Sequence, residues 1–136
     1  MTYLRRARPE DCQKIWEWRN ETGTRGVSLN PDRIPYKKHE KWYAKALKNP
    51  DILFLVVSNG YHEIGYVRIM DGEVSIAIDH NQRCKHYGSD ALSQVSWGRS
   101  LTAIIKVGNA RSVKAFKRAG YVIESTGPEF IIMRTK

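Results

Sequence analysis

The sequence holds few cysteines, no long apolar run and few acidic side chains. Its two cysteines, Cys12 and Cys84, stand at no spacing that metal sites use, so we expect two free thiols rather than a disulfide. No stretch approaches the roughly 20 apolar residues of a membrane span. Residues 1–6 lack the apolar core of a signal peptide. These absences predict a cytoplasmic protein with no bound metal and no membrane partner.

The shortage of acidic residues leaves a strongly basic chain. Lysine and arginine number 23 against 14 acidic residues, a formal net charge of +9. Such an excess suits nucleic acid, an acidic membrane surface or a small polyanion. Solvated helix faces account for much of this charge, so it selects no ligand by itself. The 136 residues, of which 41% are hydrophobic, suffice for a single domain, residues 1–136, with its own core.

Hydrophobic periodicity predicts a mixed α/β domain with the order β-α-α-β-β-β-α-β-α-β-β. Asp71-Gly72 is a hairpin signal, and Asn109 and Gly120 are typical helix caps. We expect strands at 3–6, 52–57, 64–70, 73–78, 101–107, 121–123 and 130–133, and helices at 9–19, 35–48, 89–97 and 109–120. Residues 20–35 read as a long loop that forms a wall of the binding site, since loops of this length are often functional.

The segment between the expected strand at 73–78 and the next helix is basic and contains Gly88. The first backbone N–H groups of a helix are unpaired, and the helix dipole favours negative charge there. Arg83 and Lys85 add full positive charges to this segment. The pattern therefore predicts a loop that holds phosphate groups.

Two motifs identify a family resemblance. Residues 83–88, Arg-Cys-Lys-His-Tyr-Gly, are similar to the motif Gln/Arg-x-x-Gly-x-Gly/Ala, with His86 at the middle glycine. Residues 109–121 are similar to Asn-x-x-Ser-x-x-x-Tyr-x-x-x-Gly-Phe, with Phe116 at the first tyrosine. Both motifs belong to the GNAT superfamily of acyl-CoA-dependent N-acyltransferases. Trp18-Arg19-Asn20 and His39-x-x-Trp42-Tyr43 resemble the branch of ribosomal-protein N-terminal acetyltransferases and amino-sugar N-acetyltransferases of pseudaminic acid biosynthesis.

The resemblance implies a fold and a cofactor. The fold is a mixed, mostly antiparallel central sheet of about six to seven strands, flanked by about four helices and splayed between its fourth and fifth strands. The cofactor is acetyl-CoA (CoA), and its pantetheine arm would pair with the backbone of the fourth strand. A backbone N–H near Ile76 would donate a hydrogen bond to the oxyanion. The implied cofactor-binding residues are Ile76, Ala77, Ile78, Arg83, Cys84, Lys85, His86, Tyr87, Gly88, Ser89, Asn109, Ser112 and Phe116.

Acyl transfer to an amine also needs a base, because only the neutral amine attacks. The candidate catalytic residues are Glu73 and His39, and some members of the family that the sequence resembles carry a catalytic glutamate at the position of Glu73. The alternatives are that Glu73 is a surface carboxylate and that His39 is a core histidine with its hydrogen bonds made inside the protein. Phe116 cannot supply the proton that a tyrosine there gives the thiolate in many relatives. Even without that proton, the thiolate of a thiol with a pKa of about 8.5 is an adequate leaving group near neutral pH. Trp18, Arg19 and Asn20 are the candidate substrate-binding residues.

Three functions remain open at this point. The first is N-acetylation of a primary amine on a small molecule, with a nucleotide-linked amino sugar as the first choice, by direct attack in a ternary complex. The second is acetylation of a protein N-terminus or lysine of ribosomal type, with contact to nucleic acid or the ribosome. The third is a catalytically silent module that binds acyl-CoA or nucleic acid. A homodimer is compatible with each of them.

Overall fold

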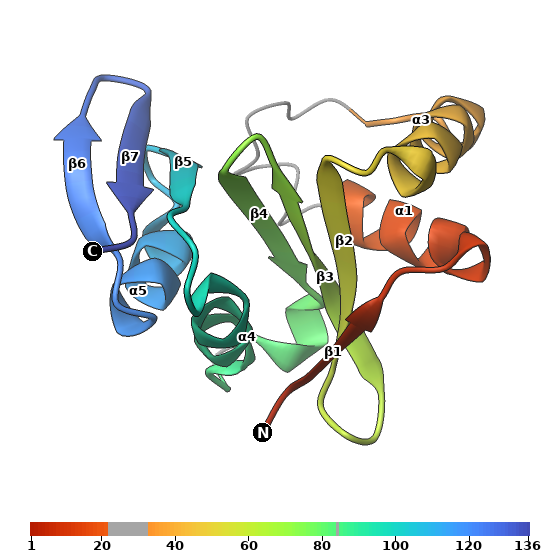
Figure 1. The fold of residues 1–136 in the computed structure, drawn as a ribbon, viewed down its shortest axis with the longest axis horizontal. Helices are drawn as coiled ribbons and strands as arrows, with labels where there is room; N and C mark the ends of the chain where they lie inside the picture. Colours follow the sequence, from red (N-terminus) through yellow and green to blue (C-terminus); the bar gives the residue numbers. More distant parts are fainter. Residues whose placement is uncertain (22–32, 84) are drawn as a thin grey trace.

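The computed structural model describes residues 1–21, 33–83 and 85–136, which form one seven-stranded sheet with helices on both faces (Figure 1). The strands are β1 (Tyr3–Arg6), β2 (Ile52–Ser58), β3 (Glu63–Met70), β4 (Glu73–Ile78), β5 (Thr102–Lys106), β6 (Val122–Thr126) and β7 (Phe130–Arg134). The helices are α1 (Cys12–Asn20), α3 (Tyr36–Lys48), α4 (Tyr87–Ser96) and α5 (Ala110–Arg118), with 3₁₀ turns η1 (Pro9–Asp11) and η2 (His80–Gln82). The predicted element order is confirmed.

The sheet has the order β1-β2-β3-β4-β5-β7-β6, and its neighbours pair antiparallel except β4 and β5. Those two strands run parallel and pair only at Glu73 and Thr102, near the start of each. Beyond that point they diverge, which is visible in Figure 1 as the separation of the green and cyan strands. The predicted fold class, including the splay between the fourth and fifth strands, is confirmed.

Two hydrophobic cores lie on opposite faces of the sheet. Successive side chains of a strand point to opposite faces, so β3 sends Val67 and Ile69 to the core that includes α4 and Tyr66 to the core beneath α1 and α3. Arg68 follows the same alternation and lies on the α1–α3 face, opposite Ser75 of β4. A charged side chain is thereby brought under two helices.

Two glycines set the path of the central strands. The β3–β4 hairpin turns through Asp71 (φ 51°) and Gly72 (φ 77°), the two positive φ values of a type I′ turn, as the sequence predicted. A Cβ on Gly65 of β3 would come within 2.1 Å of the Ala77 carbonyl oxygen and 3.0 Å of the Ile78 Cα. Only glycine lets β3 and β4 approach this closely.

Several predicted boundaries shift, and one burial prediction is wrong. The chain from Pro9 starts as a 3₁₀ turn before α1, and α4 begins at Tyr87 rather than residue 89. Trp18, a candidate substrate-binding residue expected to lie off the apolar face of its helix, is instead 2% exposed and packs in the core beneath α1 and α3, while its Nε1 has no partner among the described residues. Cys12 is a free thiol; Cys84 and most of the predicted loop, residues 22–32, lie outside the described residues.

No helix in the described ranges combines the length and the apolarity that crossing a bilayer requires.

Candidate active site

A cavity of about 920 Å³ opens where β4 and β5 diverge. Its walls come from β3, β4, β5, the first turn of α4, α5 and Arg19 of α1. Of the described residues that line it, seven are arginine or lysine and one, Glu73, is a carboxylate. The cavity is therefore a strongly cationic cleft between the two halves of the sheet.

The first turn of α4 forms one end of this cavity. The helix begins after His86, whose φ of 64° and ψ of 13° place it in the left-handed region where glycine is favoured. The motif glycine is thus replaced while its backbone conformation is kept. The Asp90 N–H bonds to the His86 carbonyl, and the Ser89 hydroxyl donates to that same carbonyl. Tyr87, Gly88 and Ser89, the first residues of the helix, line the cavity, and N–H groups in a first helical turn lack intrahelical acceptors, which suits an anion.

Asn109 and Ser112 at the start of α5 line the same cavity and bond to each other. The Asn109 Oδ1 accepts from the Ser112 N–H at 3.2 Å, and its Nδ2 donates to the Ser112 Oγ at 2.8 Å. Asn109 is therefore the predicted N-cap of α5. Because the Ser112 oxygen accepts from Asn109, its own hydroxyl proton is available to a ligand.

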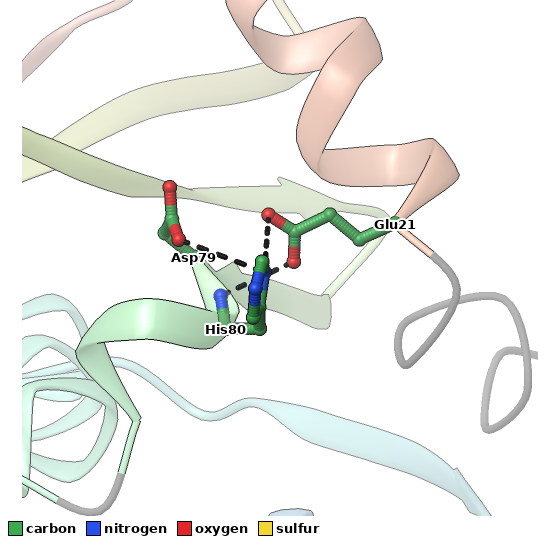
Figure 2. A group of neighbouring side chains, drawn as sticks. All are labelled: Glu21, Asp79 and His80. Carbon is green, nitrogen blue, oxygen red and sulfur yellow. Dashed lines mark hydrogen bonds and ion pairs between the residues drawn. The ribbon is translucent and has the colours of Figure 1, made fainter.

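Arg83 connects the β4–α4 loop to the end of α1. Its Nε donates to the Ile78 carbonyl at 3.0 Å, and its Nη2 lies 3.3 Å from the Glu21 carboxylate. Glu21 also accepts from the His80 N–H, and Figure 2 shows its carboxylate beside His80 and Asp79. One side-chain nitrogen or oxygen atom from each of these three residues lies within 4.8 Å of the others, a spacing that could hold a metal ion. Hydrogen bonds and ion pairs within this part of the chain, however, already engage the Glu21 carboxylate.

Phe116 lies in the cavity wall with a ring 3% exposed, in edge contact with Tyr121 at 4.9 Å between centroids. Tyr121 is the neighbouring phenol that could have replaced the missing tyrosine. Its hydroxyl instead lies 2.5 Å from the Ser96 Oγ on α4, and burial raises its pKa. Tyr121 is not among the cavity-lining residues, so it supplies no proton to the cleft.

Arg19, Tyr66 and Arg68 form the part of the cavity wall that α1 and β3 contribute. The guanidinium carbon of Arg19 lies 4.2 Å from the centre of the Trp42 ring, and that of Arg68 lies 5.4 Å from the same ring. Both contacts are cation–π distances. Trp42 therefore supports two arginines in the cavity wall.

His39 lies behind Arg19 and is fully buried. Its Nε2 donates to the Cys12 carbonyl at 2.9 Å, so its Nδ1 is the acceptor for the Arg19 Nη1 at 3.0 Å. Burial, with a smaller contribution from the Arg19 charge, lowers the pKa of His39 to about 4, so the ring is neutral near pH 7. With no exposed surface and both nitrogens bonded, His39 cannot take a proton from a substrate; it positions Arg19 instead.

The cavity brings together most of the predicted site residues. Those that line it are Arg19, Glu73, Ile76, Ala77, Ile78, Arg83, His86, Tyr87, Gly88, Ser89, Asn109, Ser112 and Phe116. Trp18, Asn20, His39 and Lys85 do not, and Cys84 lies outside the described residues. Asn20 bonds instead to the Trp16 carbonyl and the Ile34 N–H, and the Lys85 Nζ reaches the Gln82 side chain at 3.4 Å.

The sequence prediction missed Tyr66 and Arg68. The signal was present: an arginine interrupts the apolar strand Ile64–Met70, and a charge within a central strand is rare unless a ligand or a partner needs it. It also counted Arg111 and Lys114 among the solvated helix charges and did not single out Lys106, although all three line the cavity. Their position depends on how β5 and α5 pack.

The geometry agrees with comparisons to known proteins. A family model described as an acetyltransferase (GNAT) domain matches residues 2–122. No curated protein matches the sequence significantly. Among solved structures, a domain from Methanocaldococcus jannaschii is similar with a TM-score of 0.84, 20% identity and coverage of 99% of this chain and 97% of that one.

Two further structures carry ligands. Spermidine N-acetyltransferase from Vibrio cholerae, in complex with CoA and spermine, has a TM-score of 0.83 and 16% identity over 98% of this chain and 94% of that one. The aminoglycoside acetyltransferase AAC(6′)-Ib, in complex with coenzyme A and kanamycin, has a TM-score of 0.81 and 14% identity over 100% and 95% of the two chains. At these identities the structures show a shared fold, while the family model covers most of the sequence: the chain belongs to the GNAT acetyltransferase family.

Proposed function

We propose that this protein transfers the acetyl group of acetyl-CoA to a primary amine of a small molecule. The observation that carries the proposal is the single cavity that joins the diverging strands β4 and β5 to the first turn of α4. A family of acetyltransferases needs a slot for an extended thioester next to an anion-binding helix start. This cavity supplies both.

The donor half of the cavity fits acetyl-CoA by its chemistry. From Val74 to Ile78, β4 has no ladder partner on β5 among the described residues, so its backbone edge is available to the amides of an extended arm. The first turn of α4 offers N–H groups to a pyrophosphate, and Arg111 and Lys114 add positive charge. When bound, acetyl-CoA supplies an activated acyl group; the chain holds it, orients it and limits access of water.

The acceptor amine must lose its proton before it attacks. Glu73 is the one carboxylate among the described residues of the cavity, and it lies where β4 and β5 still pair. We assign Glu73 as the base that receives the amine proton, directly or through a water molecule. A backbone N–H of β4 near Ile76 would donate to the carbonyl oxygen of the thioester as negative charge develops there.

A nucleotide-linked amino sugar is our first choice of acceptor. Its support is the excess of seven cationic side chains over one carboxylate in the cavity walls. Such an imbalance is suited to two phosphorylated ligands rather than one. The amine-binding neighbours agree with amine acetylation in general and favour no particular acceptor for this chain.

The experiment is an acetyl-transfer assay that measures release of the CoA thiol. A panel of amino sugars, their phosphorylated forms, polyamines and peptide amines is offered to the purified protein. We expect turnover with at least one small amine, and expect Glu73→Gln to lower kcat by about 100-fold or more without changing the KM for acetyl-CoA. Turnover of peptide amines alone would overturn the small-molecule assignment, and thiol release from no amine would overturn the enzyme assignment.

A matched control is Glu129→Gln, since Glu129 is an exposed carboxylate that does not line the cavity. It should leave kcat unchanged. If both substitutions lower kcat equally, Glu73 does not act as the base.

A further inference from the structure

We propose that Arg19 and Arg68 form a binding site for an anionic group, a phosphate or a carboxylate, on the acceptor substrate. The inference rests on the proposed function and deepens it, because it fixes the charge of the acceptor. It predicts an acceptor opposite in charge to the spermine and kanamycin bound by two proteins of the same fold.

The two guanidinium groups converge on one side chain. Arg19 comes from α1 and Arg68 from β3, yet both lie over the ring of Trp42, at 4.2 Å and 5.4 Å from its centre. Burial is the main cause that lowers the pKa of Arg19, and the charge of Arg68 lowers it by a smaller amount. Both arginines line the same cavity, and two like charges in one cavity wall favour the binding of an anion there.

No carboxylate compensates this pair among the described residues. Neither arginine has an ion pair in residues 1–21, 33–83 or 85–136, and Glu73, the carboxylate of the cavity, bonds to neither. The same ranges show ion pairs for Arg5 and Arg83, so this basic chain does pair its structural arginines. Arg19 and Arg68 therefore line the cavity with guanidinium groups that no carboxylate among the described residues neutralises.

The pair is fixed before a ligand arrives. Arg19 is held by the Nδ1 of the buried His39, at 3.0 Å, and both arginines rest on Trp42. The Tyr66 hydroxyl, in the same wall, has no hydrogen-bond partner in the described part of the chain and adds a donor. A held fork of donors binds planar or tetrahedral anions at low entropic cost.

The pair is separate from the cations of the donor half. Arg68 lies opposite Ser75, in the strand β3 that flanks β4 on the side away from β5. Arg111 and Lys114 lie on α5, beyond the β4–β5 opening. A ligand on β4 would therefore have phosphate-binding charge on one side and the arginine pair on the other, with Glu73 between them in the order of the sheet.

The test compares acceptors that share one amine and differ in one group. Ethanolamine, O-phosphoethanolamine and β-alanine offer a hydroxyl, a phosphate and a carboxylate near the same primary amine; glucosamine and glucosamine 6-phosphate extend the comparison, and spermidine is the polycation. We expect kcat/KM to be at least about 10-fold higher for an anionic acceptor than for its neutral partner. Comparing kcat/KM for O-phosphoethanolamine with that for β-alanine shows whether the site prefers a phosphate or a carboxylate.

Arg68→Gln should reduce that preference to about 1, and Arg68→Lys should retain part of it, while the KM for acetyl-CoA stays unchanged. Lys45→Gln, on the exposed side of α3, is the control for a lost surface charge and should keep the full preference. Circular dichroism and thermal melts check that each variant is folded. A preference that survives Arg68→Gln, or faster acetylation of spermidine than of every anionic amine, overturns the inference.

A binding measurement separates this inference from the proposed function. Inorganic phosphate is titrated into protein saturated with CoA, so that the donor half is filled. We expect calorimetric binding that weakens at least about 10-fold in Arg68→Gln and with added salt. If no amine is acetylated but this binding is present, the proposed function fails and the anion site stands. Absence of phosphate binding to the CoA-saturated protein overturns the anion site.

Discussion

The Nη1 of Arg19 lies 3.0 Å from the Nδ1 of His39, and this bond joins a cavity side chain to a histidine with no exposed surface. The Cys12 carbonyl takes the Nε2 proton of the same ring and so fixes the tautomer. The sequence pattern marked His39 as a candidate base. In the structure, His39 instead positions the Arg19 side chain through this hydrogen bond, and Glu73 is the remaining candidate base in the cavity.

The burial of neutral His39 predicts how folding stability depends on pH. Its pKa is lowered from 6.5 to about 4, so the unfolded chain takes up a proton before the folded one does. The free energy of unfolding should be greatest above pH 6.5 and fall by up to about 3 kcal/mol as the pH drops to about 4. Urea unfolding at pH 7, 6, 5 and 4 measures this loss.

His39→Gln is the control for that measurement, because glutamine bonds without titrating. Bonds to Arg5 and Thr2 lower the pKa values of Asp11 and Asp90 below 3.8, so most of their loss falls below pH 3.8 and only its beginning overlaps the pH 4 point. An unchanged pH slope in His39→Gln would show that another group is responsible.

His86→Gly should stabilise the protein. A side chain in the left-handed region costs about 1–2 kcal/mol, although histidine tolerates it better than most residues. Glycine removes that cost. It also raises the conformational entropy of the unfolded chain, which offsets part of the gain, so we expect the free energy of unfolding to increase by about 0.5–1 kcal/mol. His86→Ala keeps the Cβ and should show no gain. A lower melting temperature in His86→Gly than in His86→Ala would contradict the left-handed geometry.

Phe116→Tyr should raise kcat. The ring lines the cavity, and a phenol there would supply the thiolate with the proton that phenylalanine cannot. We expect a gain of up to about 10-fold in thiol release, modest because a thiolate leaves without protonation near neutral pH. Tyr121→Phe is the comparison: it breaks the bond to Ser96 and lowers stability by about 1 kcal/mol, with kcat unchanged.

Gly65→Ala should disrupt the β3–β4 pair. The new Cβ would overlap the Ala77 carbonyl oxygen at 2.1 Å, and a backbone neighbour cannot rotate away. We expect a loss of more than about 2 kcal/mol in stability and weaker binding of acetyl-CoA, because β4 must shift. Gly127→Ala, whose Cβ would meet its nearest neighbour at 3.6 Å, should change neither quantity. A stable Gly65→Ala protein would mean that the strands are farther apart.

Local patterns in the sequence were sufficient for the elements and for the donor loop. Three features depend only on residues that are neighbours in the sequence, and the structure contains all of them: the Asp71-Gly72 turn, the Asn109 cap and helix α4. The left-handed conformation of His86 was not predicted, although the motif has glycine, which favours that conformation, at this position. Boundaries moved by one to three residues because caps and 3₁₀ turns adjust to packing.

The acceptor side could not be derived in that way. Arg19 and Arg68 are 49 positions apart in the sequence, and only the packing of α1 and α3 on the face of β3 brings them to the Trp42 ring. The same packing buries His39 and Trp18, which the local pattern had assigned to the site. Local chain chemistry was sufficient to predict the helices, the turns and the basic segment between β4 and α4. Tertiary structure decided which charged side chains face the cavity, because burial and convergence are properties of packed surfaces rather than of neighbouring residues.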